Sequence, residues 1–526
     1  MAGGNALGRD LARLVGWAER AQEARGGHGR FGQRIHLMPP TGWMNDPNGL
    51  CQVDGEFHAF FQYGPFDVRG GVKLWGHAVS RDLLTWEHVG APLLPDEPFD
   101  LHGVYSGSAV VEDGRIRAVY TGNVKLPDPD GAFDYVNRGR EGNTVLVESA
   151  DGGRTFGEKR LVLTPADYPA DLTCHVRDPK VWREGDSYLM VLGARRRVEG
   201  PAAPCRFSAL HGEGAGRDVG EILVWSSPDL VSWTLENRVR TPERFGFMWE
   251  CPDYLDLPVG PADGPQAGGS QTAGHLAGRA RFLCCSPQGA EGGAWDRRNM
   301  YVAGYFEVGG DILGDARLGA FRLWDAGFDF YAPQTFEAAD GRRIMIGWMG
   351  MPDEPSYGND PTVEQGWQHC MTLPREVTAS PAGGLLQAPV REIEGLRGVL
   401  TEGEGTLSVV GDAARCFDFI ARGCEHGLHL LVHGALSVAW LPAEEGLPAR
   451  LEMRFLDGSR SAAGCGRTVR WEPLARLNDL RVVGDASSVE VFANDGALVM
   501  STRIYPDAYG IEVEASGAEL RFWPLG

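Results

Sequence analysis

The sequence contains no apolar run of about 18 residues, the length that a membrane-spanning helix needs. The segment before Gln33 has a helical stripe of Leu11, Leu14, Val15 and Ala18, but charged residues interrupt it. It therefore lacks the apolar core of a signal peptide. We expect a cytoplasmic protein with reduced thiols.

Positive charge is also scarce. The 50 Lys and Arg residues face 71 Asp and Glu, which gives a formal net charge of −21, and lysine occurs only at positions 73, 125, 159 and 180. Such a chain repels phosphate backbones and anionic lipids, so we expect neither nucleic acid nor a membrane as partner. A small neutral or locally neutralised ligand fits better. The sequence indicates no oligomeric state.

Metal-binding patterns are missing too. The 10 cysteines include no C-x-x-C pair and no Cys/His cluster at zinc spacing, so we expect no metal and no other cofactor. Helical periodicity is nearly absent after the N-terminal segment, so a helical bundle fits poorly. The 73 Gly, 33 Pro and 10% aromatic residues instead favour many short strands joined by tight turns.

A weak repeat indicates how these strands are arranged. Three segments share a serine, a turn-forming aspartate and a following aromatic residue, at residues 80–86, 149–156 and 226–233. Their starts are 149 − 80 = 69 and 226 − 149 = 77 residues apart. A unit of roughly 70 residues suits a four-stranded propeller blade, although three unrelated serine turns are the simpler alternative.

The chain is therefore predicted to be all-β with three parts. Residues 1–32 form a short N-terminal helical extension, and residues 33–375 hold about five blades of roughly 70 residues each, a five-bladed β-propeller. Residues 376–526 begin with a linker and continue as alternating strands, with an Asn494-Asp495-Gly496 turn, which predicts a C-terminal β-sandwich.

Three acidic residues lie in apolar or aromatic motifs that end in proline. They are Asp46 in WMNDPNG, Asp178 in RDP and Glu250 in WECP. The spacings, 178 − 46 = 132 and 250 − 178 = 72, are close to two blades and one blade. Each motif is thus expected at an equivalent position on the innermost strand of a different blade, and the three acids should converge on the central funnel.

Each acid alone has a simpler explanation. Asp46 could be a turn residue, Asp178 an ion-pair partner of Arg177, and Glu250 a surface acid beside an aromatic ring. Together they favour a site, because like charges brought close cost stability unless they serve a purpose.

Two carboxyl groups in different environments are the minimum machinery for cleaving a glycosidic bond. Glu250 has apolar neighbours, which should raise its pKa and make it the acid. Asp46 lies among the amides of Asn45 and Asn48, which should stabilise its charge. Asp178, beside Arg177, should stay ionised and stabilise a positively charged transition state.

The motifs WMNDPNG, RDP and ECP, in this order, resemble the signatures of glycoside hydrolase family 32, the invertase and β-fructofuranosidase group. Supporting matches extend over nearly the whole chain after Gln33: FQYGP, WGHAVSRDLLTW, YSGSAV, FDFYAPQTF and SSVEVFANDG. The resemblance implies a five-bladed propeller followed by a β-sandwich. It also implies retaining hydrolysis of terminal β-D-fructofuranosides, in sucrose, sucrose-6-phosphate or short fructo-oligosaccharides.

The resemblance also assigns roles to residues. Asp46 would be the nucleophile, Glu250 the acid/base and Asp178 the transition-state stabiliser. The substrate-binding residues would be Asn45, Gln62, Trp75, Tyr105, Ser106, Arg177, Cys251 and Trp348.

Two departures concern the pocket wall. Gly64 stands where the family has an asparagine, and Gly70 stands where a tryptophan is frequent. The resemblance therefore does not decide which substrate is preferred. A fructan exohydrolase or a fructosyltransferase is the alternative, and an inactive sugar-binding propeller a remote one. The run Arg195 to Arg197 could clamp a sugar phosphate or be a solvated loop, and His77 is expected to be a core histidine rather than a base.

Overall fold

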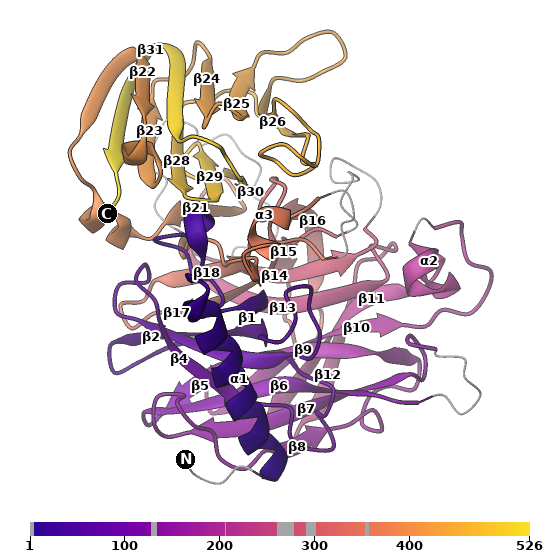
Figure 1. The fold of residues 1–526 in the computed structure, drawn as a ribbon. Coiled ribbons are helices and arrows are strands. Elements are labelled where there is room, and N and C mark those ends of the chain that lie inside the picture. Colours follow the sequence, from indigo (N-terminus) through magenta and orange to yellow (C-terminus); the bar gives the residue numbers. More distant parts are fainter. Residues whose placement is uncertain (1–4, 128–133, 206, 260–277, 291–300, 353–356) are drawn as a thin grey trace.

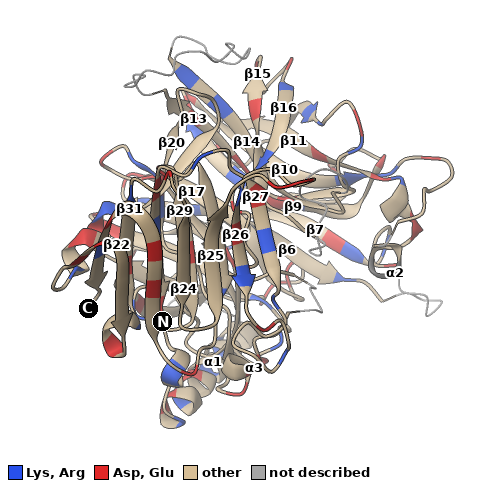
Figure 2. Cartoon of the chain, turned by 90° about the horizontal axis from the view of Figure 1, so that it is seen from above, with Lys and Arg blue, Asp and Glu red and all other residues tan. Residues whose placement is uncertain are grey.

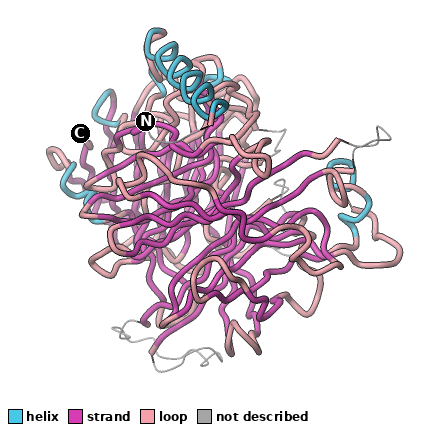
Figure 3. Tube along the Cα trace, turned by 90° about the horizontal axis from the view of Figure 1, so that it is seen from below, coloured by secondary structure: helices cyan, strands magenta, loops and turns pink. Residues whose placement is uncertain are grey.

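The computed structural model describes residues 5–127, 134–205, 207–259, 278–290, 301–352 and 357–526. A β-propeller and a β-sandwich follow each other along the chain (Figure 1). The 19-residue helix α1 (Ala6–Ala24) precedes them and lies along the outside of the propeller (Figures 1 and 3). The all-β prediction, with its N-terminal helix, is confirmed.

Five sheets form the blades, and within each sheet the strands follow one another in chain order. The strands of blade I are β1 (Gly42–Val53), β2 (Glu56–Gly64), β3 (Leu74–Ser80) and β4 (Glu87–Leu93); of blade II, β5 (Val104–Glu112), β6 (Arg115–Lys125), β7 (Arg140–Ser149) and β8 (Arg160–Leu163). Those of blade III are β9 (Leu172–Glu184), β10 (Ser187–Arg196), β11 (Val219–Ser227) and β12 (Thr234–Val239); of blade IV, β13 (Met248–Pro258), β14 (Arg279–Gln288), β15 (Gly304–Gly309) and β16 (Arg317–Leu323). Blade V consists of β17 (Tyr331–Glu337), β18 (Arg343–Trp348), β20 (Arg375–Ala379) and β21 (Leu385–Pro389).

The first strands β1, β5, β9, β13 and β17 contact one another in a closed ring, so they are the innermost strands. The short strand β19 (Trp367–Gln368) pairs in parallel with β1 and ties a segment of blade V to blade I. Short helices occupy connections: α2 (Ser208–His211), α3 (Asp360–Val363), η1 (Gly29–Phe31), η2 (Glu213–Gly216), η4 (Arg391–Leu396) and η5 (Asp412–Ala414).

The serine repeat marks the hairpin between the third and fourth strands of blades I to III. In each, a serine hydroxyl donates to the aspartate two residues on, at 3.0 Å for Ser80–Asp82, 2.8 Å for Ser149–Asp151 and 3.1 Å for Ser227–Asp229. The aspartate then accepts backbone N–H groups of the turn, and the following aromatic residue packs against a blade core. The repeat is therefore a true structural unit.

Every innermost strand carries a β-bulge. At each bulge the innermost strand has one residue more than the second strand that pairs with it. The bulges contain Asn45 and Asp46, Tyr105 and Ser106, Asp178 and Pro179, Cys251 and Pro252, and Ala332 and Pro333. A bulge bends the strand and re-aims its side chains. The three acids thus lie at the bulges of β1, β9 and β13, although not at one equivalent position: Glu250 precedes its bulge, Asp178 is the first residue of its bulge and Asp46 is the second.

The C-terminal β-sandwich is built from β22 (Thr401–Val410), β23 (Phe417–Arg422), β24 (Leu428–Val432), β25 (Leu436–Leu441), β26 (Arg450–Phe455), β27 (Val469–Pro473), β28 (Asp479–Asp485), β29 (Ser488–Ala493), β30 (Leu498–Arg503) and β31 (Gly510–Pro524). The long strand β31 pairs with β24 near its start and with β23 near its end, so it belongs to both layers. Between the layers lies a core of buried aliphatic and aromatic side chains.

The predicted boundary at residue 375 falls inside the propeller. Strands β20 and β21, which follow it, are the third and fourth strands of blade V, so that blade extends to Pro389. The segment expected to be a linker supplies β21 and then the 3₁₀ helix η4. Alternation alone does not tell the outer strands of a blade from the strands of a sandwich, since both are antiparallel and half-buried.

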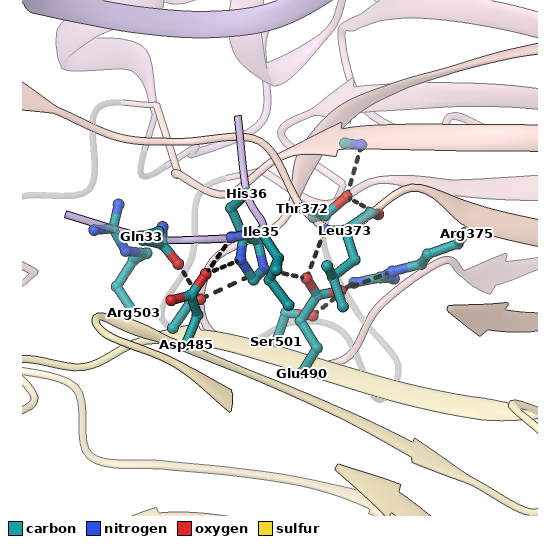
Figure 4. Close-up of polar contacts among 12 residues, drawn as sticks. Gln33, Ile35, His36, Thr372, Leu373, Arg375, Asp485, Glu490, Ser501 and Arg503 are labelled. Carbon is teal, nitrogen blue, oxygen red and sulfur yellow. Dashed lines mark hydrogen bonds and ion pairs between the residues drawn. The ribbon is translucent and has the colours of Figure 1, made fainter. Parts of the chain in front are cut away.

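A buried polar network joins the propeller to the sandwich (Figure 4). His36, on the propeller side, contacts Asp485 Oδ2 through Nδ1 at 2.9 Å and Glu490 Oε1 through Nε2 at 3.0 Å, both from the sandwich. Arg375 of blade V donates to Glu490 Oε2 at 2.6 Å and to Asp325 Oδ2 at 3.1 Å. These carboxylates raise the pKa of His36 to about 9 despite its full burial, so the ring is a cation at neutral pH.

Candidate active site

The bulges of the innermost strands open onto one cavity of about 290 Å³ on the propeller axis. Asp46, Asp178 and Glu250 all line it. The expectation that three acids from different blades converge is therefore met in the structure. Like charges this close need strong local partners, and each acid has a different set.

Asp46 is held mainly by hydroxyl and amide donors. Ser106 Oγ donates to Asp46 Oδ2 at 2.5 Å, and Asn45 Nδ2 donates to Oδ1 at 3.2 Å. Gln62 Nε2 in turn donates to Ser106 Oγ at 2.7 Å, which orients the hydroxyl toward the acid. Removal from bulk water nevertheless raises the pKa of Asp46 above its usual value, and the charge of Glu250 adds to this.

Glu250 has a cation as its closest partner. Arg177 donates to Glu250 Oε1 from Nη2 at 2.6 Å and from Nε at 3.2 Å, and Tyr331 OH donates to Oε2 at 2.8 Å. Burial alone would raise the pKa of Glu250, but the Arg177 charge and these hydrogen bonds together hold it below its usual value. The expected rise in the pKa of Glu250 is therefore wrong, because its carboxylate contacts Arg177 and Tyr331 rather than an apolar surface.

Asp178 departs from expectation in the opposite direction. It adopts the left-handed region at φ = 64°, which is costly for a residue with a side chain, and its carboxylate accepts the N–H of Cys251 at 3.0 Å. Burial and the charges of Glu250 and Asp46 outweigh Arg177 and raise the pKa of Asp178 to about 7. Arg177 Nε lies 3.8 Å from Asp178 because the guanidinium is turned toward Glu250, so the predicted full ionisation is wrong.

Most of the substrate-binding residues expected from the resemblance are brought together. Those that line the cavity are Asn45, Gln62, Tyr105, Ser106, Arg177, Cys251 and Trp348. Trp75 does not line it: the side chain is fully buried behind the cavity wall, and its indole N–H donates to Tyr105 O at 3.0 Å. Trp75 is thus a positioning residue for the backbone of β5.

Two further expectations are decided by burial and pairing. Arg195, Arg196 and Arg197 do not line the cavity; Arg195 is buried and paired with Asp218 at 2.8 Å, which excludes the clamp as a part of this site. His77 is a core histidine, as expected, stacked on Phe60 with ring centroids 4.1 Å apart.

Sequence reasoning missed part of the lining: Trp43, Lys73, Tyr135, Arg140, His175, His211, Gln288, Tyr301, Tyr331 and Pro352. Tyr331 had a detectable signal. Tyr331-Ala332-Pro333 repeats the pattern of Glu250-Cys251-Pro252 at 332 − 251 = 81 residues, about one blade later. Trp43 also had a signal, since it lies in the WMNDPNG motif on β1, and His175 lies on β9 two residues before Arg177. The others come from loops and second or third strands, where no motif marks them.

The chain matches the N-terminal domain of glycosyl hydrolases family 32 over residues 36–203 and 206–389, and the C-terminal domain over residues 454–524. It is 37% identical over 492 residues to a sucrose-6-phosphate hydrolase of Klebsiella pneumoniae (92% of this chain, 90% of the relative) and 34% identical over 500 residues to one of Bacillus subtilis (92% and 91%).

Solved structures show the same architecture. A sucrose-6-phosphate hydrolase from Lactobacillus gasseri has a TM-score of 0.79 at 24% identity, covering 97% of this chain and 96% of its own. A β-fructofuranosidase of Bombyx mori has a TM-score of 0.76 at 26% identity, covering 98% of each. None of the described helices is long and apolar enough to cross a bilayer. The chain belongs to glycosyl hydrolase family 32 and is a glycoside hydrolase of its β-fructofuranosidase group.

Proposed function

We propose that this enzyme hydrolyses terminal non-reducing β-D-fructofuranoside bonds of sucrose, sucrose-6-phosphate and short fructo-oligosaccharides, with retention of configuration. The observation that carries the proposal is the meeting of three carboxylates with three different sets of partners in one cavity of about 290 Å³. A cavity of this size takes a small sugar rather than a polymer in full.

Asp46 acts as nucleophile in this proposal. Its carboxylate attacks the anomeric carbon of the fructosyl group while Glu250 gives a proton to the departing glycosidic oxygen, leaving a fructosyl–enzyme ester. Glu250 then takes a proton from water, which attacks the same carbon and releases fructose and free Asp46. The Gln62–Ser106–Asp46 chain of hydrogen bonds holds the nucleophile in position.

The proton for the first step has to reach Glu250, which Arg177 keeps ionised. Asp178, with a pKa of about 7, is the group that holds a proton there near neutral pH. The three acids interact, so a proton bound by the cavity belongs to the set rather than to one residue. Binding of fructose hydroxyls to Asp178 favours its ionised form and moves the proton toward Glu250, where the leaving oxygen needs it.

Substitution of the nucleophile tests the assignment. Asp46→Ala should reduce fructose release from sucrose by at least about 10³-fold, because the covalent step is lost. The thermal transition should remain, since no described residue needs Asp46 for packing. Retained activity in a folded Asp46→Ala protein would refute the proposal.

A second variant separates the two roles. In Glu250→Ala, the second step should be rescued by azide, which needs no general base, and the product should be a fructosyl azide of retained configuration. Rescue with inverted configuration would instead identify Glu250 as the nucleophile.

Comparing initial rates on sucrose, sucrose-6-phosphate, 1-kestose, inulin and levan ranks the substrates. Faster cleavage of inulin or levan would replace the proposal with a fructan exohydrolase.

We also propose a cytoplasmic location. The cysteines of the described residues form no disulfide, as is usual in a reducing compartment. A functional enzyme recovered only from the culture medium or periplasm would contradict this.

A further inference from the structure

The floor of the cavity repels an anionic substrate. Three carboxylates line it, and the nearest cation, Arg177, is already committed to Glu250 at 2.6 Å. The overall charge of −21 adds to the repulsion, and Figure 2 shows acidic and basic positions interspersed over the strands and loops. A phosphorylated sugar therefore needs a cation that lines the cavity and is not already paired.

Lys73 meets this requirement. It lies at the end of the loop between β2 and β3 of blade I, immediately before the pair of Leu74 with Tyr63, and it lines the cavity. Its ammonium lies 4.7 Å from the ring centroid of Trp43, which is three residues before the proposed nucleophile. Within the described residues, Lys73 Nζ has neither a hydrogen-bond acceptor nor a carboxylate at salt-bridge distance.

Two glycines leave space beside the Lys73 amine, whose pKa burial lowers to about 7 against the opposing charges of Asp46 and Asp67. A Cβ atom at Gly64 would lie 3.5 Å from Lys73 Nζ and 2.9 Å from Gly70 O, and one at Gly70 would lie 3.6 Å from Lys73 Nζ. Gly70 also has φ = 124°, a conformation that side-chain-bearing residues avoid. These are the two pocket-wall positions where a larger side chain was expected, and their side chains would fill the space around the ammonium.

Arg140 also lines the cavity, but it is less available to a ligand than Lys73. Arg140 begins the corresponding third strand of blade II, but its Nη1 donates to Tyr135 OH at 2.8 Å and its Nη2 to Asn123 Oδ1 at 2.7 Å. It is held between the rings of Tyr105 and Tyr135. Arg140 therefore supplies fixed positive potential, whereas the flexible Lys73 can reach a ligand.

We propose that Lys73 is a specificity-determining residue that binds the phosphate of a phosphorylated leaving sugar and so makes the enzyme favour sucrose-6-phosphate over sucrose. This inference rests on the proposed function. With fructose held by the three acids, the other sugar has to lie outward of them, beside Trp43 and the loop that carries Lys73. A charge-assisted hydrogen bond from Nζ to the phosphate then makes up for the hydration that the ammonium has partly lost on burial.

The test compares kcat/KM for sucrose-6-phosphate with kcat/KM for sucrose. Lys73→Met should lower this ratio about ten- to one-hundred-fold, the usual worth of a hydrogen bond to a charged group. Lys73→Arg should keep most of the ratio. Arg69→Met is the matched control, since Arg69 is an exposed cation of the same loop outside the cavity, and it should leave the ratio unchanged.

A product-inhibition measurement makes the test independent of turnover number. Glucose 6-phosphate should compete with sucrose more strongly than glucose does in the parent enzyme, and Lys73→Met should remove the difference. An unchanged substrate ratio or an unchanged inhibition difference in Lys73→Met would overturn the inference. A parent enzyme that releases fructose from neither substrate would instead refute the proposed function itself.

Discussion

At the scale of single residues, the charge of Arg177 decides how the acids ionise. Arg177 Nη1 lies 2.7 Å from His175 Nδ1, which accepts the hydrogen bond as a neutral ring because its pKa lies well below the usual value. The guanidinium is thereby directed at Glu250 and away from Asp178. This explains why the site has the reverse of the ionisation pattern that the local sequence suggests.

Tyr331 tunes the same acid from the other side. Tyr331→Phe removes the 2.8 Å hydrogen bond to Glu250 Oε2, which stabilises the carboxylate, so the pKa of Glu250 should rise. The basic limb of the pH profile of kcat/KM should therefore move to higher pH, with a two- to tenfold lower maximum, the worth of about 0.5–1.5 kcal/mol.

The control for this prediction is Tyr254→Phe, a tyrosine of β13 that stacks on Trp182 outside the cavity. Its pH profile should match that of the parent enzyme. A basic limb that stays in place in Tyr331→Phe would show that Tyr331 does not act on the proton-donating group.

At the scale of elements, the sequence repeat reveals the blade, and the bulge in each innermost strand directs side chains into the site. In the bulged, proline-containing innermost strands, Asp178 and Cys251 are the first residues of their bulges and Asp46 is the second residue of its bulge. Arg177 and Glu250 each lie immediately before a bulge. Neighbouring positions of one repeated strand thus supply a nucleophile, a cation and an acid.

The serine–aspartate hairpins should contribute stability rather than activity. Asp82 Oδ1 accepts the N–H groups of Leu84 at 2.9 Å and Thr85 at 2.7 Å. Asp82→Ala should lower the free energy of unfolding by about 1–2 kcal/mol, because these donors lose their partner in the turn. We expect a lower Tm with unchanged kcat/KM for sucrose.

Asp186→Ala is the matched control, since Asp186 is an exposed aspartate in the β9–β10 hairpin with no hydrogen bond among the described residues. Its Tm should equal that of the parent protein. Equal Tm values for Asp82→Ala and the parent would mean that the repeat has no stabilising role.

At the scale of the whole molecule, the propeller and the sandwich depend on the charge of His36. Its folded-state pKa of about 9 lies above the ordinary 6.5, so the stabilisation is complete below pH 6.5 and is lost as the pH rises through about 9. Loss of the proton leaves Asp485 and Glu490 buried with one cation fewer between the two bodies.

A Tm series from pH 6 to 10 measures this dependence. His36→Gln, which cannot be charged, should have a lower Tm than the parent at pH 6, and the difference should shrink toward zero above about pH 9. His426→Gln, at an exposed histidine of the sandwich, should follow the parent throughout. A difference that does not change with pH would show that size and hydrogen bonding, rather than charge, hold the interface.

The sequence by itself determined the architecture and the three acids. Strand periodicity, the serine repeat and the proline-ended acidic motifs are local signals, and a propeller repeats local units around an axis, so their spacing is enough to place them. The end of blade V was misplaced because its outer strands β20 and β21 have the same antiparallel alternation as the sandwich that follows.

Only the tertiary structure decided the electrostatics of the site and its wall. The ionisation of Glu250 and Asp178 depends on the direction of one guanidinium, and the exclusion of Trp75 and of Arg195 to Arg197 depends on burial. Lys73 joins the cavity from a loop with no motif of its own. The interaction between charges depends on their distance in space and not on their separation in the chain. Residues far apart in the sequence therefore set the ionisation of the site, although sequence motifs are enough to locate it.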